Sequence, residues 1–189
     1  TYMEELGMRA REASREVQFL EQSKKNEGLC KVAAELRKNA AYLIEENQKD
    51  VAQERAKGTK ESLIDRLLLS EERIQAMALG LEQVAKLDDP VGEVTQMKVR
   101  PNGLQIGQKR VPLGVVGVIY ESRPNVTADV FGLCLKTGNV AVLRGGSDAF
   151  YSNMAVVQVI RAGLRAAAIT EDAIVFVEDR SRSVVTDMM

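Results

Sequence analysis

Histidine is absent from the 189-residue sequence, and cysteine occurs only twice, as Cys30 and Cys134. Without histidine, the chain cannot form a catalytic triad of the Ser–His–Asp type, and it lacks a ligand that most zinc sites use. We therefore expect no metal site in this chain. Two cysteines do not make a disulfide framework, which favours a reducing, cytoplasmic location.

Neither sign of charge dominates, since 26 Lys and Arg residues face 27 Asp and Glu residues. This balance argues against nucleic acid or an anionic membrane as the main partner. No apolar run reaches the roughly 20 residues that span a bilayer, and the charged N-terminal segment does not resemble a signal peptide. The apolar fraction of 45% is high enough for a substantial core.

The first part of the chain, residues 1–92, has the apolar spacing of amphipathic helices. Apolar residues three and four positions apart predict one helix over residues 3–20 and another over residues 26–43. Gly58 then interrupts a polar stretch. Ser70 is a suitable N-cap for a third helix, because its hydroxyl can accept a hydrogen bond from an N–H of the first turn.

Residues 93–112 have the pattern of a β-hairpin. Two strand-like segments, 94–100 and 104–111, flank the turn signal Pro101-Asn102-Gly103, in which proline presets one dihedral and glycine tolerates a positive φ. The apolar alternation is only partial and does not fix the register. We expect this hairpin to project from the main body or to join a partner subunit, which predicts a homo-oligomer.

Residues 113–189 change to a pattern of short strands and helices. Three apolar segments are typical of strands covered on both faces: 115–119, 140–143 and 173–177. Helical segments separate them, one ending near Lys136 and the other near Ala167. This strand–helix–strand–helix–strand order predicts a parallel sheet with right-handed crossovers, and hence an α/β fold.

Two polar loops, 120–125 and 144–147, follow the first two predicted strands. In open parallel sheets ligands bind beyond the carboxyl ends of the strands, and each loop precedes a helix N-terminus, which favours anions. Gly145 and Gly146 allow the backbone to approach a ligand, and the Arg144 guanidinium suits phosphate. These loops predict a nucleotide or phosphate site. Because neither a G-x-G-x-x-G nor a P-loop pattern occurs, the glycines alone are equally compatible with a simple turn.

Longer segments carry a family resemblance. Val111 to Ile119 (VPLGVVGVI) resembles the opening of the cofactor domain in the aldehyde dehydrogenase superfamily. The pattern of the gamma-glutamyl phosphate reductases is present in ESRPNVT at 121–127, LKTGN at 135–139 and LRGGS at 143–147. Aldehyde dehydrogenases at large have Trp-Asn-Phe-Pro and Leu-Lys-Pro-Ser in the corresponding loops. The resemblance covers essentially the whole chain, which is similar to the N-terminal, cofactor-binding part of that reductase family.

The resemblance implies a Rossmann-like parallel sheet of the aldehyde dehydrogenase type, with N-terminal helices and a projecting β-hairpin. It also implies NADPH-dependent reduction of a small molecule, L-glutamyl 5-phosphate, to L-glutamate 5-semialdehyde, with release of phosphate, in proline biosynthesis. In this family a cysteine thiolate attacks the acyl phosphate and hydride reduces the thioester. Glutamate 5-kinase is a candidate partner.

The resemblance also assigns roles to the two polar loops. The residues expected to bind the cofactor are Tyr120, Glu121, Arg144, Gly145, Gly146 and Ser147. Arg144 occupies the place of the superfamily lysine that contacts the adenosine ribose, and a guanidinium there suits a 2′-phosphate. Asn125 falls near the asparagine that donates to the oxyanion in the superfamily, although the loop is shorter here. Arg123 is a candidate for the phosphate or carboxylate of the substrate, and a solvated surface charge is an equal alternative.

Neither cysteine suits the role of nucleophile. Cys30 lies beside the apolar face of the second predicted helix, and Cys134 lies between two leucines of a later helix, so both are expected to be small buried apolar residues. By resemblance, the catalytic cysteine belongs to a separate domain later in the chain, which is missing from this sequence. We expect the cofactor-binding part by itself to be inactive.

Two other interpretations remain open. The chain is also compatible with the reductase half of a fused kinase–reductase synthase, although the absence of kinase sequence before residue 1 favours a stand-alone protein. Alternatively, it is a non-catalytic nucleotide-binding or assembly module. A downstream reading frame with a cysteine-containing domain favours the enzyme, and a stop codon after Met189 favours the module.

Overall fold

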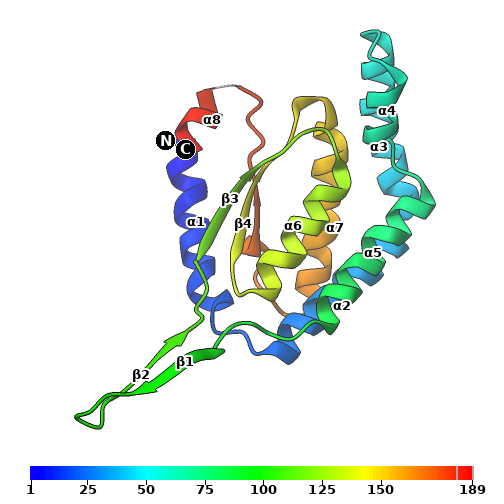
Figure 1. Cartoon of the computed structure of the whole chain (residues 1–189). Helices are drawn as coiled ribbons and strands as arrows, with labels where there is room; N and C mark the ends of the chain where they lie inside the picture. Colours follow the sequence, from blue (N-terminus) through cyan, green and yellow to red (C-terminus); the bar gives the residue numbers. More distant parts are fainter. Residues whose placement is uncertain (182, 189) are drawn as a thin grey trace.

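The computed structural model describes residues 1–181 and 183–188. It has a three-stranded parallel sheet, a separate β-hairpin and a set of surrounding helices (Figure 1). The helices are α1 (Tyr2–Val17), α2 (Gln22–Lys38), α3 (Ala40–Ala56), α4 (Glu61–Leu67), α5 (Glu71–Lys86), α6 (Pro124–Lys136), α7 (Phe150–Ala166) and α8 (Ser183–Met188). The strands are β1 (Val94–Val99), β2 (Gln105–Lys109), β3 (Val115–Ile119), β4 (Val140–Arg144) and β5 (Ile174–Phe176), and short 3₁₀ turns occupy Ser147–Ala149 and Glu171–Ala173.

The parallel sheet has the order β3-β4-β5, as the alternating strands and helices predict. In Figure 1 the sheet lies between α1 on one side and α6 and α7 on the other. The central strand β4 is buried from Val140 to Leu143, because it is covered on both faces. The α/β order expected from the sequence is therefore confirmed.

A second helical layer packs behind α6 and α7. It consists of α2, α3 and α5, and α2 crosses α7 at Gly163. A Cβ added at Gly163 would lie 2.5 Å from the Cα of Val32, so only glycine allows this approach of the two helices. The close packing of these layers holds the carboxyl ends of β3 and β4 beside α3 and α4.

The helical part differs from the prediction at two places. The helix expected over residues 26–43 is two helices, because the chain turns at Asn39, whose side-chain amide donates to the carbonyl of Glu35 at 2.8 Å. The polar stretch after Gly58 contains a further helix, α4, that the prediction did not include. The predicted N-cap is confirmed, since the Ser70 hydroxyl accepts from the N–H of Arg73 at 3.2 Å.

The hairpin forms as predicted, with β1 and β2 antiparallel. A bulge lies between Thr95 and Lys98, and Gln96 has a φ of 54°. The bulge explains the partial alternation, because an extra residue reverses the faces of the side chains that follow it. The apolar side chains of the hairpin are exposed, and Val99 keeps 68% of its surface.

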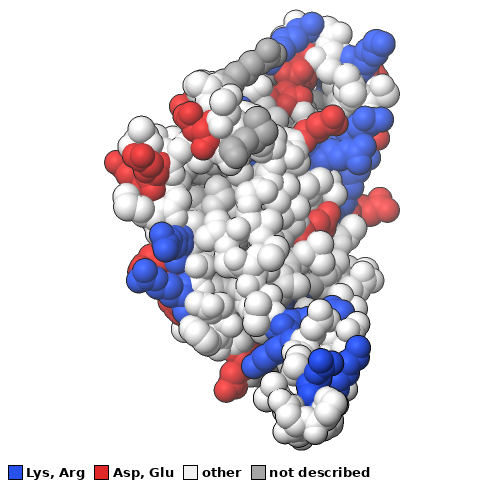
Figure 2. Space-filling view, turned by 60° about the vertical axis from the view of Figure 1, so that its left-hand side comes forward, with Lys and Arg blue, Asp and Glu red and all other residues white. Residues whose placement is uncertain are grey.

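The strand β3 is an edge of the described sheet, and its side chains Val115 and Ile119 are exposed. The view in Figure 2 shows a broad face with few charged side chains above the hairpin. Among the described residues, no helix has the length and apolar character needed to cross a membrane.

Candidate functional site

The loops after β3 and β4 meet at the carboxyl end of the sheet and line a cleft of about 780 Å³. We call this the cofactor cleft, after the role that the sequence predicts for it. Five of the six predicted cofactor residues line it: Tyr120, Glu121, Arg144, Gly146 and Ser147. The end of α3, helix α4 and the segment around Arg180 complete the walls. Parallel pairing thus brings the two predicted loops together, as expected for this class of sheet.

The sixth residue, Gly145, is buried beneath the cleft rather than exposed in it. A Cβ at this position would collide with the amide of Asn153 and would lie 3.2 Å from the Tyr120 ring. The glycine is therefore required by protein packing. The expectation that it brings the backbone close to a ligand does not follow from its position.

Tyr120 is fixed by a chain of side-chain hydrogen bonds. Its hydroxyl lies 2.6 Å from the Thr127 hydroxyl, which donates to the Asn153 amide oxygen at 3.1 Å. Burial raises the pKa of Tyr120 to about 12, so the phenol stays protonated at neutral pH. These contacts make Tyr120 a rigid wall of the cleft and not an acid or base.

Arg144 ends β4 and directs its guanidinium along the neighbouring backbone. It donates to the carbonyl of Gly145 and, at 3.1 Å, to the carbonyl of Arg180. Its Nε is buried, and within residues 1–181 and 183–188 it has no hydrogen-bond partner. A guanidinium has five N–H donors, so this contact pattern leaves donors for an anion in the cleft.

The N-terminus of α7 is occupied by the protein itself. The Asp50 carboxylate of α3 accepts from the backbone N–H of Ser152 at 2.7 Å, from the Ser152 hydroxyl at 2.6 Å and from the N–H of Tyr151 at 3.3 Å. Desolvation raises the pKa of Asp50, and these hydrogen bonds oppose that shift. Asp50 therefore takes two of the N–H groups at the start of α7 that an anion was expected to bind.

Side chains therefore supply most of the positive charge in the cofactor cleft. Five basic side chains line it, against three acidic ones. The basic residues are Lys57, Arg66, Arg123, Arg144 and Arg180. The Arg180 guanidinium lies 3.8 Å from the centre of the Phe150 ring, which orients it by a cation–π contact. The sequence prediction missed Lys57, Arg66 and Arg180, since they come from segments that no local motif links to the loops.

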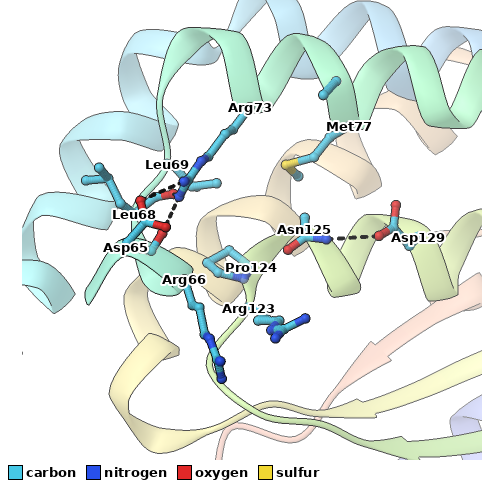
Figure 3. A pocket seen from close by; sticks show the side chains of 11 residues that line it. Asp65, Arg66, Leu68, Leu69, Arg73, Met77, Arg123, Pro124, Asn125 and Asp129 are labelled. Atoms are coloured by element: carbon cyan, nitrogen blue, oxygen red, sulfur yellow. Dashed lines mark hydrogen bonds and ion pairs between the residues drawn. The ribbon is translucent and has the colours of Figure 1, made fainter. Parts of the chain in front are cut away.

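A second pocket of about 560 Å³ adjoins the cofactor cleft (Figure 3). It lies between the α4–α5 region and the start of α6, and we call it the α5–α6 pocket. Arg66 and Arg123 line both spaces, so the two are neighbours. Asn125 lines only the second pocket, and thus lies apart from the predicted cofactor residues.

Asn125 is held by a residue one turn further along α6. Its side-chain amide donates to the Asp129 carboxylate at 3.1 Å. Desolvation raises the pKa of Asp129, and the hydrogen bond from Asn125 lowers it. One amide hydrogen of Asn125 is used in this way, and the second is left for another acceptor.

The two cysteines have different surroundings. Cys134 is buried in α6, as expected, and burial raises the pKa of its thiol to about 11. Cys30 is exposed on α2, so the expectation that it is buried is wrong: its position beside the apolar stripe leaves it on the solvent side of the helix. Neither thiol lines the cofactor cleft or the α5–α6 pocket. The described residues also hold no group of three His, Cys, Asp or Glu side chains that is suited to a metal ion.

Comparisons with known proteins agree with the family resemblance. No family model matches the sequence. The gamma-glutamyl phosphate reductase of Clostridium perfringens is 50% identical over 97% of this chain, and that of Moorella thermoacetica is 54% identical over 95%. The chain spans only 44% and 43% of the length of these relatives.

The fold has close counterparts among solved structures. The gamma-glutamyl phosphate reductase of Thermotoga maritima matches 97% of this chain with a TM-score of 0.94 and 44% identity, and the chain covers 44% of that protein. The yeast counterpart gives a TM-score of 0.87 at 26% identity. A probable aldehyde dehydrogenase from Listeria monocytogenes shares the fold at 15% identity, with a TM-score of 0.73. The predicted resemblance to this reductase family, and to the aldehyde dehydrogenase fold, is thereby confirmed.

Proposed function

We propose that this chain is the cofactor-binding part of a gamma-glutamyl phosphate reductase that reduces L-glutamyl 5-phosphate to L-glutamate 5-semialdehyde with NADPH, releasing phosphate, as a step of proline biosynthesis. The similarity to reductases over 97% of the chain supports this activity. The single structural observation that supports it best is the basic cofactor cleft at the carboxyl ends of β3 and β4.

The cleft fits a phosphorylated dinucleotide in shape and charge. Its volume of about 780 Å³ lies within the range typical of cofactor sites, and its lining carries more positive than negative charge. Gly146 lines the cleft, and a Cβ there would lie 2.9 Å from the Ser122 hydroxyl and 2.5 Å from the Asp148 carboxylate, so this glycine lets the two loops pack together at the cleft. The residues present therefore fit the cofactor that the resemblance implies.

Arg144 is proposed to select NADPH over NADH. Its buried Nε has no partner among the described residues, and its remaining N–H groups are suited to a 2′-phosphate. Bound NADPH would supply the hydride for the reduction. Tyr120, Glu121, Gly146 and Ser147 would line the cofactor, while Gly145 would act indirectly by allowing Tyr120 and Asn153 to pack.

Asn125 and Arg123 are proposed to act on the substrate. The second amide hydrogen of Asn125 suits the negative charge that develops on the acyl oxygen, because a neutral donor stabilises this charge without transferring a proton. Arg123 stands between the cofactor cleft and the α5–α6 pocket, where it can hold the phosphate or carboxylate. Since neither Cys30 nor Cys134 lines these spaces, the nucleophilic cysteine would come from another part of the enzyme.

The assembly of the enzyme belongs to the same proposal. The hairpin is proposed to join a partner subunit in a homo-oligomer, because its apolar side chains are exposed. An association with glutamate 5-kinase, which makes the labile acyl phosphate, would be chemically useful. A cytoplasmic location would agree with two unpaired cysteines.

The substitution Arg144→Ala in the whole reductase tests the cofactor assignment. Charge-assisted hydrogen bonds contribute about 1.5–3 kcal/mol, so the ratio of kcat/KM with NADPH to that with NADH should fall roughly 10- to 100-fold. The loss should arise chiefly from weaker NADPH binding. The matched control is Arg11→Ala, which removes an exposed arginine of α1 outside both pockets. An unchanged ratio in the Arg144 variant would show that this residue does not read the 2′-phosphate.

A further inference from the structure

The α5–α6 pocket contains charged side chains that the cofactor site does not use. Two of them satisfy each other, because Arg73 donates to the Asp65 carboxylate at 2.8 Å and to the carbonyl of Leu68 at 2.8 Å. This pair ties the end of α4 to the start of α5 and forms a wall of the pocket (Figure 3). The other charged side chains of the pocket, which can contact a ligand, are Arg66, Arg123 and Asp129.

The two arginines make the junction of the two spaces attractive to anions. Arg66 and Arg123 are exposed, and neither guanidinium has a hydrogen-bond or ion-pair partner in the described part of the chain. Both border the cofactor cleft as well as the pocket. Helix α6 begins there without a side-chain cap, so the positive end of its dipole adds to the charge of the arginines.

Asp129 gives the pocket one negative side chain. In the view of Figure 3, the guanidinium groups of Arg66 and Arg123 lie below the Asn125–Asp129 pair. Asp129 is exposed, but partial desolvation raises the pKa of its carboxyl group, and a neighbouring cation would favour the charged form. Two arginines without partners among the described residues, and one carboxylate that is bound only by the neutral Asn125 amide, thus define the charge pattern of the pocket.

We infer that the α5–α6 pocket binds the amino-acid end of the substrate, with Asp129 as the receptor for its α-ammonium group. This inference rests on the proposed function. Glutamyl 5-phosphate carries one ammonium group and two anionic groups, the α-carboxylate and the phosphate, which complement Asp129, Arg66 and Arg123. The apolar side chains of Met77, Leu69 and Pro124 line the space for its methylene groups.

The two polar side chains of α6 support this orientation. The Asn125 amide and the Asp129 carboxylate meet at 3.1 Å, so a single ligand can contact both. The glutamyl chain is flexible, and its α-ammonium can turn to Asp129 while its acyl oxygen accepts the second amide hydrogen of Asn125. Asp129 would therefore determine specificity for an amino-acid substrate over the corresponding simple dicarboxylic derivative.

The test compares two aldehydes in the reverse reaction of the whole reductase, with phosphate and NADP⁺: glutamate 5-semialdehyde and glutarate semialdehyde, which lacks the α-amino group. The substitution is Asp129→Asn, because asparagine keeps an oxygen that accepts from Asn125 and removes only the charge. The unmodified enzyme should prefer the amino substrate by roughly 10- to 100-fold in kcat/KM, and the variant should lose this preference. The loss should come from the amino substrate alone.

Other outcomes overturn the assignment. If Asp129 only positions Asn125, both substrates should decline together in Asp129→Asn, and the preference should persist. Asp129→Ser gives a second variant without the charge, and unchanged NADP⁺ binding shows that either variant is folded. Glu45→Gln removes an exposed carboxylate of α3 outside the pocket and should leave the preference unchanged. If the unmodified enzyme oxidises neither aldehyde, the proposed function itself fails, and the assignment fails with it.

Discussion

The carboxyl end of the parallel sheet and the β-hairpin lie at opposite ends of the structure (Figure 1), and different interactions stabilise each region. At the carboxyl end, polar side chains from distant segments meet: the buried amide of Asn47 donates to the Leu67 carbonyl and the Ser152 hydroxyl and accepts from the N–H of Leu69. In the hairpin, the ladder joins residues close in sequence, and apolar side chains such as Val99 face outward.

This difference separates positions that carry the fold from positions that are free to carry an interface. A change at the carboxyl end leaves buried donors and acceptors without partners, which is costly because water cannot replace them. A change on the outer faces of the hairpin alters a surface and little else. The cofactor cleft therefore stands on a rigid base, whereas the hairpin can adapt to whatever it contacts.

The largest effect is expected for Asn47→Ala. The substitution leaves the Leu69 N–H, the Leu67 carbonyl and the Ser152 hydroxyl with fewer partners in a buried site. Because each unsatisfied buried group costs about 1–3 kcal/mol, the free energy of unfolding should fall by about 3–5 kcal/mol. Denaturant unfolding of the whole protein, followed by circular dichroism, measures the loss.

The neighbouring residue on α3 provides the control. Gln48 is exposed and makes no side-chain hydrogen bond within the described residues, so Gln48→Ala should change the free energy of unfolding by less than about 0.5 kcal/mol. Equal losses in the two variants would mean that α3 stabilises the protein only through its helical backbone. The polar junction would then have no special part in supporting the cleft.

The next largest effect is expected at Asn125, the residue that is proposed to act on the substrate. In the whole reductase, Asn125→Ala should lower kcat by about 10²–10³, with a smaller change in substrate binding, because the amide is proposed to act in the transition state. Steady-state kinetics with NADPH measure both constants. Binding of NADPH should be unchanged, since Asn125 lines the α5–α6 pocket and not the cofactor cleft. A nearly normal kcat would exclude Asn125 as the oxyanion donor.

Local patterns in the sequence were sufficient for most elements of the fold. The strands β3, β4 and β5 and the helices between them are encoded by short apolar runs and by the turns that separate them. The break at Asn39 was missed because apolar spacing continues across it, and only the side-chain contact with Glu35 marks the turn. Helix α4 was missed because it is short and its burial depends on contacts with α3.

The candidate site was predictable only where it is built from loops with a family pattern. The loops after β3 and β4 were identified, because parallel pairing brings their ends to one edge of the sheet. Arg66 and Arg180 could not be found in this way, since α4 and the segment after β5 reach the cleft through tertiary packing. The role of Asp50 at α7 was also hidden, because a buried carboxylate on an amphipathic helix looks like any other polar residue.

A smaller effect distinguishes the two cysteines. Burial raises the pKa of Cys134 to about 11, so its thiolate is scarce until the pH approaches that value, and its thiolate fraction at pH 8 is lowered about a hundredfold. Cys30 is exposed. Alkylation by iodoacetamide at pH 8, followed by peptide mass spectrometry, should therefore modify Cys30 first. Fast modification of Cys134 in the folded protein would show that α6 opens readily.

The smallest effect on the fold is expected in the hairpin, for Val99→Lys. The side chain is 68% exposed, so the free energy of unfolding should change by less than about 0.5 kcal/mol. If the hairpin joins a partner subunit, the same change places a charge in an apolar contact and should weaken self-association of the whole protein. Sedimentation velocity over a range of concentrations measures the association, and thermal unfolding measures the fold. A variant that associates as the unmodified protein does would exclude Val99 from any interface. A large loss of thermal stability without any change in association would instead show that the hairpin supports the fold of its own chain.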